Sequence, residues 1–323
     1  MKREPKLEKL VQDIKQRVAN FYDLNDYFSP HKALIVQALK LSFLVPEVEV
    51  QKFLDSMLSP ESLQKNTNDH ELCKNMVEII KAYHNIDDTP QGKQNLERFL
   101  ADYRPSSILF HGTNSAYLPL IEKEGLVVRS DNSFEDEVKA IDSIYAKQNG
   151  EAHHPFYHLA GSKISQQVCL SNSSNAVSYA TNAPEWFGLI VGCLGGDFGA
   201  HNCFRNRDKA GALAAIKNNI STFSKDEQET VLSYFQKHWD MLGESEPTLL
   251  VARVEPNKEY KGIDFDNADD TILYELNTGQ MTGNCEVRVN KVPSEDLIHI
   301  PLTPPKLKKQ TVNNENANDL KID

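Results

Sequence analysis

The spacing of the hydrophobic residues changes at Arg104-Pro105, and this change constrains the fold more than any other feature of the sequence. Before it, apolar residues recur at steps of three and four, as along residues 7–18, which is the pattern of a helix with one buried face. After it, short apolar runs such as residues 107–113 (SILFHGT) are separated by polar segments, as expected for strands. The sequence therefore predicts an N-terminal α-helical domain over residues 1–103.

Strands and helices are mixed in the next part, residues 104–305, which we predict to be a second domain. A helix that ends at Gly125, and helical residues 206–242 with a capping-box sequence at Ser224 and Glu227, interrupt the strands. Because strands and helices do not alternate strictly, we expect the α+β class rather than a doubly wound parallel sheet. The expected strands are VCLSN (168–172), TLLVARVEP (248–256), TILYEL (271–276), CEVRVNKV (285–292) and LIHI (297–300).

Three further segments are interpreted from their composition. Residues 306–323 are polar and lack an apolar period, so we predict a disordered tail. Residues 131–165 form an insertion that we expect over or beside a site; within it, Pro155 breaks the spacing of HHPFYH (153–158), which indicates a polar lid and no metal. The glycine-rich GCLGGDFG (192–199) fits no phosphate-binding motif and predicts a flexible turn.

Charge and cysteine content exclude several classes of protein. The net charge of −11 opposes nonspecific attraction to nucleic acid, and the five cysteines are odd in number and scattered, which favours a reducing cytosol over a disulfide framework. No apolar run approaches the roughly 18 residues that would cross a bilayer, and the start of the chain lacks a hydrophobic signal segment. We therefore expect a cytoplasmic protein that binds neither nucleic acid nor a membrane.

The first motif with chemical meaning is His111, which stands at the end of an apolar strand ahead of Gly112 and Thr113. A glycine lets a ligand approach the main chain, whose N–H and C=O can hold a planar amide, while the imidazole can bond a sugar hydroxyl. Taken alone, this motif fits a locally satisfied strand-end histidine at least as well.

Two more motifs follow in the chain. In CLSNSSNAVSYAT, a strand ends at Ser171 and a helix presents Tyr179, whose ring can lie flat against an aromatic ligand, although a core tyrosine explains the pattern equally well. In GQMTGNCEVRV, Glu286 begins a strand after a glycine-containing loop. A carboxylate there can stabilise positive charge that develops on a ribose, although a solvated glutamate is the simpler interpretation.

The order of these motifs resembles the ADP-ribosyltransferase superfamily, in the histidine-tyrosine-glutamate branch shared by diphtheria-type toxins and poly(ADP-ribose) polymerases. The resemblance covers about residues 105–302 and implies a split β-sandwich that binds NAD. It implies that His111 bonds the adenosine ribose, that Gly112 grips the nicotinamide carboxamide through its backbone, and that Tyr179 stacks on nicotinamide. It further implies that Glu286 is catalytic and that Ser171 is the strand-end serine, with Thr113 beside the cofactor.

The sequence departs from the family pattern at the second nicotinamide-stacking ring. The branch has two tyrosines about ten residues apart, whereas the position eleven before Tyr179 is Val168. One face of the nicotinamide therefore lacks its usual partner. Three aromatic residues are candidates to replace it: Trp186, Phe156 and Tyr157.

A second departure concerns the acidic residues. The arginine-specific branch has a glutamate or glutamine two residues before the catalytic glutamate, whereas Asn284 stands two before Glu286, so arginine is a doubtful acceptor. Because the motifs are widely spaced, Glu137 and Glu275 are alternative acids for the site.

The resemblance predicts a mono-ADP-ribosyltransferase that transfers ADP-ribose from NAD to a protein, with release of nicotinamide and without a metal. The polar tail and the missing signal segment also resemble bacterial virulence effectors injected into host cells, whose acceptors are host proteins. Three alternatives stay open: an NAD glycohydrolase that uses water, a non-catalytic binding module on the same fold, and an RNA 2′-phosphotransferase, which the acidic charge disfavours.

Overall fold

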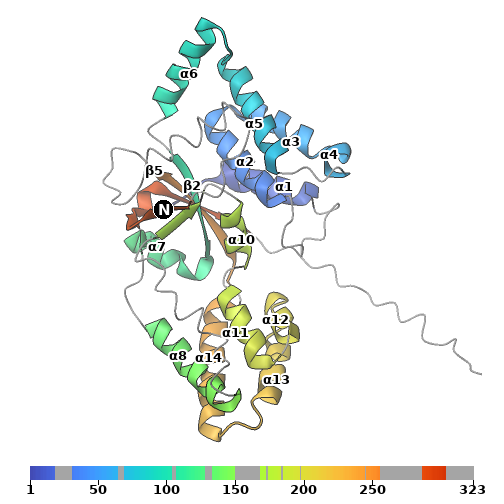
Figure 1. Cartoon of the computed structure of the whole chain (residues 1–323), viewed down its shortest axis with the longest axis vertical. Helices are drawn as coiled ribbons and strands as arrows, with labels where there is room; N and C mark the ends of the chain where they lie inside the picture. Colours follow the sequence, from blue (N-terminus) through green and yellow to red (C-terminus); the bar gives the residue numbers. More distant parts are fainter. Residues whose placement is uncertain are drawn as a thin grey trace, which may run out of the picture.

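The computed structural model shows an elongated molecule in which a β-sheet lies between two groups of helices (Figure 1). The helices of residues 1–103 lie above the sheet in this view, and a second helical group lies below it. The structure describes residues 1–18, 31–64, 69–103, 107–127, 133–149, 168–171, 174–182, 185–196, 198–243, 245–254 and 286–302.

Six strands of the described chain form one mixed sheet, in the order β1-β8-β5-β2-β4-β6. Its pairs are antiparallel except for the parallel pair of β1 and β8. The strands are β1 (Lys2–Arg3), β2 (Ser107–Asn114), β4 (Val168–Ser171), β5 (Pro247–Val254), β6 (Glu286–Val289) and β8 (Leu297–Pro301). The sequence prediction of the α+β class is thus confirmed. The two-residue strand β1 was not expected, because two charged residues carry no apolar pattern.

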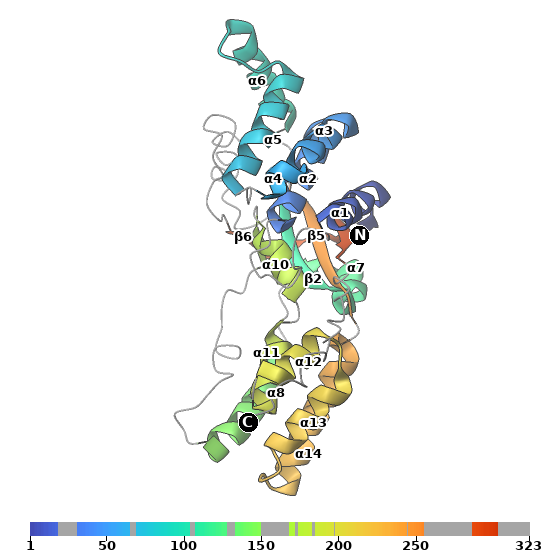
Figure 2. The ribbon, with the colours of Figure 1, turned by 90° about the vertical axis from the view of Figure 1, so that its right-hand side faces the viewer.

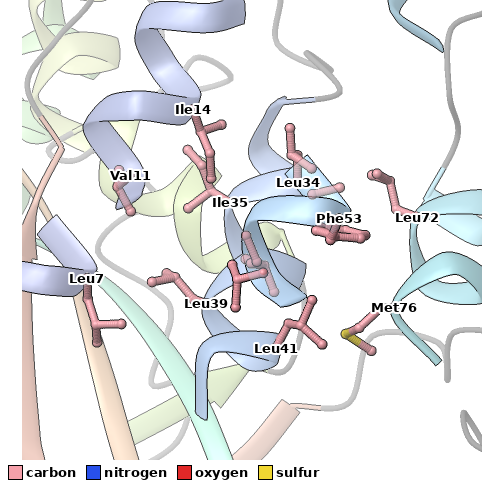
Figure 3. Close-up of a cluster of buried hydrophobic side chains, with 14 of the residues drawn as sticks. Leu7, Val11, Ile14, Leu34, Ile35, Leu39, Leu41, Phe53, Leu72 and Met76 are labelled. Atoms are coloured by element: carbon pink, nitrogen blue, oxygen red, sulfur yellow. The ribbon is translucent and has the colours of Figure 1, made fainter. Parts of the chain in front are cut away.

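The first hundred residues form helices, as their hydrophobic spacing predicts. They are α1 (Pro5–Val18), α2 (His31–Leu44), α3 (Glu47–Met57), α4 (Pro60–Gln64), α5 (Asp69–His84) and α6 (Pro90–Tyr103). Apolar side chains of α1, α2, α3 and α5 meet in one cluster, where Phe53 and Leu39 are completely buried (Figure 3). Pro46 is the N-cap of α3, which explains the break between α2 and α3.

This helical core continues onto one face of the sheet. Phe110 of β2 and Val251 of β5 belong to the same buried cluster as α1 and α2, together with Ala176 of α10 (Asn175–Asn182). The N-terminal helices and α10 therefore cover this face side by side. Burial of apolar surface here joins the predicted first domain to the sheet.

The opposite face of the sheet carries a smaller core. Leu109 and Leu250 pack there against Ile121 of α7 (Leu118–Glu124). Helix α7 ends as predicted at a glycine, since Gly125 has a φ of 81°. The core also includes a second sheet of two short strands, β3 (Leu126–Val127) and β7 (Lys291–Val292).

Two segments far apart in the sequence contribute helices that share a third core (Figure 2). We call this group of helices the helical unit. Its helices are α8 (Ser133–Asn149), α11 (Glu185–Gly195), α12 (Phe198–Arg205), α13 (Lys209–Asn219) and α14 (Lys225–Leu242). The capping box predicted at Ser224 and Glu227 is present at the start of α14. The prediction of a flexible turn over residues 192–199 is wrong. Residues 192–195 complete α11, and residues 198–199 begin α12. Gly196, with a φ of 77°, makes a tight turn between them.

Several predictions fall on residues outside this description. They are the strand over residues 271–276 and the tail 306–323. None of the described helices has the length and apolar character needed to cross a membrane. Four cysteines of the described chain, Cys73, Cys169, Cys193 and Cys203, are free thiols.

We predict that Phe235→Ala destabilises the helical unit strongly. Phe235 is fully buried against Phe187 and Trp239, so truncation leaves a cavity and lowers the free energy of unfolding by about 3–5 kcal/mol. Met241→Ala on the same helix, where the side chain is 40% exposed, is the control and costs less than about 0.5 kcal/mol. Urea denaturation measures both; equal losses contradict the assigned core.

Candidate functional site

The sheet opens between β2 and β4. Among the described residues these strands share one register pair, Phe110 with Ser171. Beyond it, Leu170 and Cys169 pair with β6 on their other side but have no register partner on β2. We call this divergence of β2 from β4 the fork. Main-chain groups at such a strand edge are able to hold a ligand.

His111 stands at the point where the fork opens. Its Nδ1 lies 2.9 Å from the carbonyl oxygen of Cys169, which can only accept, so Nδ1 carries the proton and donates it across the fork. Burial lowers the pKa of His111, while the bond to Cys169 opposes that shift. The neutral ring therefore keeps an unprotonated Nε2, which can accept a hydrogen bond from a hydroxyl group.

Gly112 lies in direct contact with α10. A Cβ atom at this position would lie 2.2 Å from the carbonyl oxygen of Ala176 and 2.4 Å from the nitrogen of Ala180. It would also lie 2.8 Å from Cβ of Tyr179. The glycine is thus needed because a helix backbone touches the strand, which sequence analysis did not foresee. The same contact places Tyr179, whose side chain is 60% exposed, directly beside Gly112.

His111 and Tyr179 lie on opposite faces of β2. Successive side chains of a strand alternate, so His111 shares the face of Leu109, whereas Gly112 shares the face of Phe110 that α10 covers. A single ligand can contact both residues only by lying across the edge of β2. Such a ligand would lie at the fork.

Ser171 joins the strand of His111 to the strand of Glu286. It pairs with Phe110 of β2 on one side and with Glu286 of β6 on the other. Because neighbouring strands are about 4.8 Å apart, the backbone of Glu286 lies about 10 Å from Phe110. The structure therefore brings the backbones of all three motifs together around the fork. Ser171 and Thr113 are buried, with 7% and 8% exposure.

The other candidate residues named from the sequence do not lie at the fork or lie outside the described residues. Val168, in place of a second tyrosine, packs in the core beneath the sheet with 6% exposure. The residues that lie outside the described backbone are Phe156, Tyr157, Glu275, Asn284 and the histidines of segment 153–158. Trp186 belongs to α11, and its side chain is likewise outside the description.

Glu137, the alternative acid, lies on α8 in the helical unit. One of its carboxylate oxygens accepts from Nζ of Lys237, and the other lies 2.9 Å from Nε2 of His238. These bonds lower the pKa of Glu137 despite its partial burial. Both carboxylate oxygens of Glu137 are thus bonded to residues of α14. The side chain links α8 to α14 within the helical unit and is not positioned as the acid of the fork.

Sequence analysis missed the small residues that meet Gly112. Ala176 and Ala180 stand four apart on α10, and both are fully buried. This spacing places two small side chains on one helix face and permits close packing. The spacing of Ala176 and Ala180 is visible in the sequence. It indicates a close contact only once Gly112 is known to lie opposite them.

No family model, curated protein or solved structure matches this chain. Within the described residues, no group of three or more His, Cys, Asp or Glu side chains is arranged to hold a metal ion. The geometry of the fork is therefore the basis for assigning a function.

We predict that Gly112→Ala lowers the free energy of unfolding by about 2 kcal/mol or more, because the added methyl group overlaps backbone atoms of α10. Gly243→Ala is not a suitable control, since its Cβ would meet Trp239. Thr113→Ser, which removes one methyl group from the next residue, is the matched control and should cost less than about 1.5 kcal/mol. Unchanged stability in Gly112→Ala would show that strand and helix are further apart.

We predict that His111 titrates below the ordinary histidine pKa of about 6.5. A lowered pKa in the folded state means that the unfolded chain binds more protons, so stability falls as the pH drops from about 6.5 through the folded pKa. Above about pH 6.5 this residue adds no pH dependence. Proton NMR of the imidazole measures the midpoint, and His111→Gln should remove this part of the pH dependence; a midpoint at or above 6.5 contradicts the buried geometry.

Proposed function

We propose that this chain is an NAD-dependent mono-ADP-ribosyltransferase with an ADP-ribosyltransferase-like fold and a protein acceptor. The observation that carries the proposal is the fork, around which the backbones of His111, Gly112, Tyr179 and Glu286 converge from three separate elements, β2, α10 and β6. A large and a small sheet that share one core also fit the split β-sandwich of that family.

The nicotinamide end of NAD fits the α10 side of the fork. Amide groups of the β2 edge near Gly112 can bond a carboxamide, and the exposed ring of Tyr179 beside it offers a flat surface for stacking. On the other face, the unprotonated Nε2 of His111 can accept a hydrogen bond from a ribose hydroxyl. NAD would thus cross the strand edge in a bent conformation.

The proposed reaction breaks the bond between ribose C1′ and the nicotinamide nitrogen, and nicotinamide leaves with the electron pair. The positive charge that develops on the ribose is stabilised by the carboxylate of Glu286, one strand away from Ser171. A nucleophile of the acceptor protein then bonds to C1′ and loses its proton. Holding both reactants in place supplies much of the rate acceleration.

We predict that labelled NAD incubated with this protein and a host-cell lysate gives labelled protein bands, and that Glu286→Gln reduces labelling at least about 100-fold. The amide retains the shape of the carboxylate but cannot balance the developing charge. The matched control is Glu295→Gln in η2 (Ser294–Asp296), an exposed glutamate that should label normally. Labelling by electrophoresis and nicotinamide release by chromatography are measured together.

Each outcome of this experiment has one meaning. Persistent labelling in Glu286→Gln shows that another acid is catalytic. Nicotinamide release without labelled protein shows that water is the acceptor and that the chain is a glycohydrolase. A folded wild-type protein that neither binds nor consumes NAD contradicts the proposal and favours a binding module.

A further inference from the structure

The helical unit contains a polar cluster at its end nearest the sheet. Glu137 of α8 bonds Lys237 and His238 of α14, and the ring of Tyr234 packs on the ring of His238 with centroids 4.4 Å apart. His238 and Tyr234 are buried, and the Tyr234 hydroxyl has no hydrogen-bond partner in the described structure. We call these four residues the α8–α14 cluster.

The α8–α14 cluster is connected to the fork through η1 (Ser115–Tyr117), which directly follows β2. Tyr117 packs between the core of the helical unit and the core beneath the sheet. Tyr234 of α14 belongs to the core of the helical unit against which Tyr117 packs, and burial, Glu137 and Tyr117 together raise the pKa of the Tyr234 phenol. Movement of α14 at this end therefore alters the core against which Tyr117 of η1 packs.

The 3-10 helix is in turn fixed to the strands of the site. The nitrogen of Ser115 donates to the carbonyl oxygen of Glu246, and its hydroxyl accepts from the nitrogen of Glu246, both at 2.8 Å. The buried side chain of Asn114 accepts from the nitrogen of Ala116 at 2.9 Å. These bonds join η1 to β5 and to the last residue of β2, three positions after His111.

We propose that Glu137, with His238 and Lys237, is a positioning group for the open end of the fork. Burying the His238 imidazole and the Tyr234 hydroxyl, which is unbonded in the described structure, and partly burying the Glu137 carboxylate costs desolvation free energy. Apolar contacts would join the two helices without that cost. Fixed polar bonds, however, define one relative placement of α8 and α14. That placement sets η1 and, through it, the end of β2. The inference deepens the proposed function, because it assigns control of that site to the helical unit.

The test compares two ion pairs that join the same helices. Glu137→Gln weakens the pair near η1, whereas Lys147→Met removes the pair with Glu227 at the far end of α8 and α14. Hydrogen–deuterium exchange of the peptide over residues 111–118 should be several-fold faster in Glu137→Gln and unchanged in Lys147→Met. In NAD turnover, Glu137→Gln should lower kcat about tenfold with little change in KM, since misplacement of a site affects reaction more than binding.

Equal exchange in wild type and Glu137→Gln would overturn the inference, as would the same acceleration in both variants, which indicates general destabilisation. If Glu137→Gln does not fold, Lys237→Met removes the exposed partner alone and should accelerate exchange in the same peptide. The exchange measurement needs no NAD. A wild-type protein without NAD turnover therefore contradicts the proposed function, while the exchange result still decides the role of the cluster.

Discussion

The contact of β2 with α10 at Gly112 is the constraint on which the arrangement of the site depends. Any side chain at this position would overlap the backbone of Ala176 and Ala180, so helix and strand can approach this closely only because both sides are small. The contact fixes Tyr179 beside the strand that carries His111. It also brings α10 into the same buried cluster as the N-terminal helices. Packing of α10 with the N-terminal helices and placement of the Tyr179 ring are thus two consequences of one close approach.

The fork is a second constraint, and it follows from how the strands use their hydrogen bonds. A strand that leaves its neighbour exposes main-chain donors and acceptors that must find other partners. On β4 this need is met at one residue by the His111 ring, whose Nδ1 bonds the Cys169 carbonyl. The histidine therefore has a structural role in closing the base of the fork, and the proposed function assigns a second role to its other nitrogen. Satisfying Nδ1 locally selects the tautomer that can accept at Nε2.

Local features of the fold could be predicted from the sequence, whereas long-range ones could not. The helix over residues 7–18, the glycine end of α7 and the capping box at Ser224 depend on neighbouring residues, and each is present. The assignment of residues 192–199 to a turn failed because glycine suggests a break, although apolar packing of α11 against α12 and α13 stabilises the helix. The strand β1 and the union of α8 with α11–α14 arise from contacts between residues far apart in the chain, which periodicity does not encode.

For the site, the sequence identified which residues to examine but not how they relate in space. Motif order alone did not indicate that His111 and Gly112 face opposite sides of β2, nor that the glycine is required by a helix. Both facts depend on the alternation of β2 between two cores, one containing Phe110 and the other Leu109. Immediately beyond its end, Tyr117 meets the third core. A strand whose two faces lie in two cores, with a third core directly after its end, is a rigid base, because its side chains cannot shift without disturbing packing on both sides.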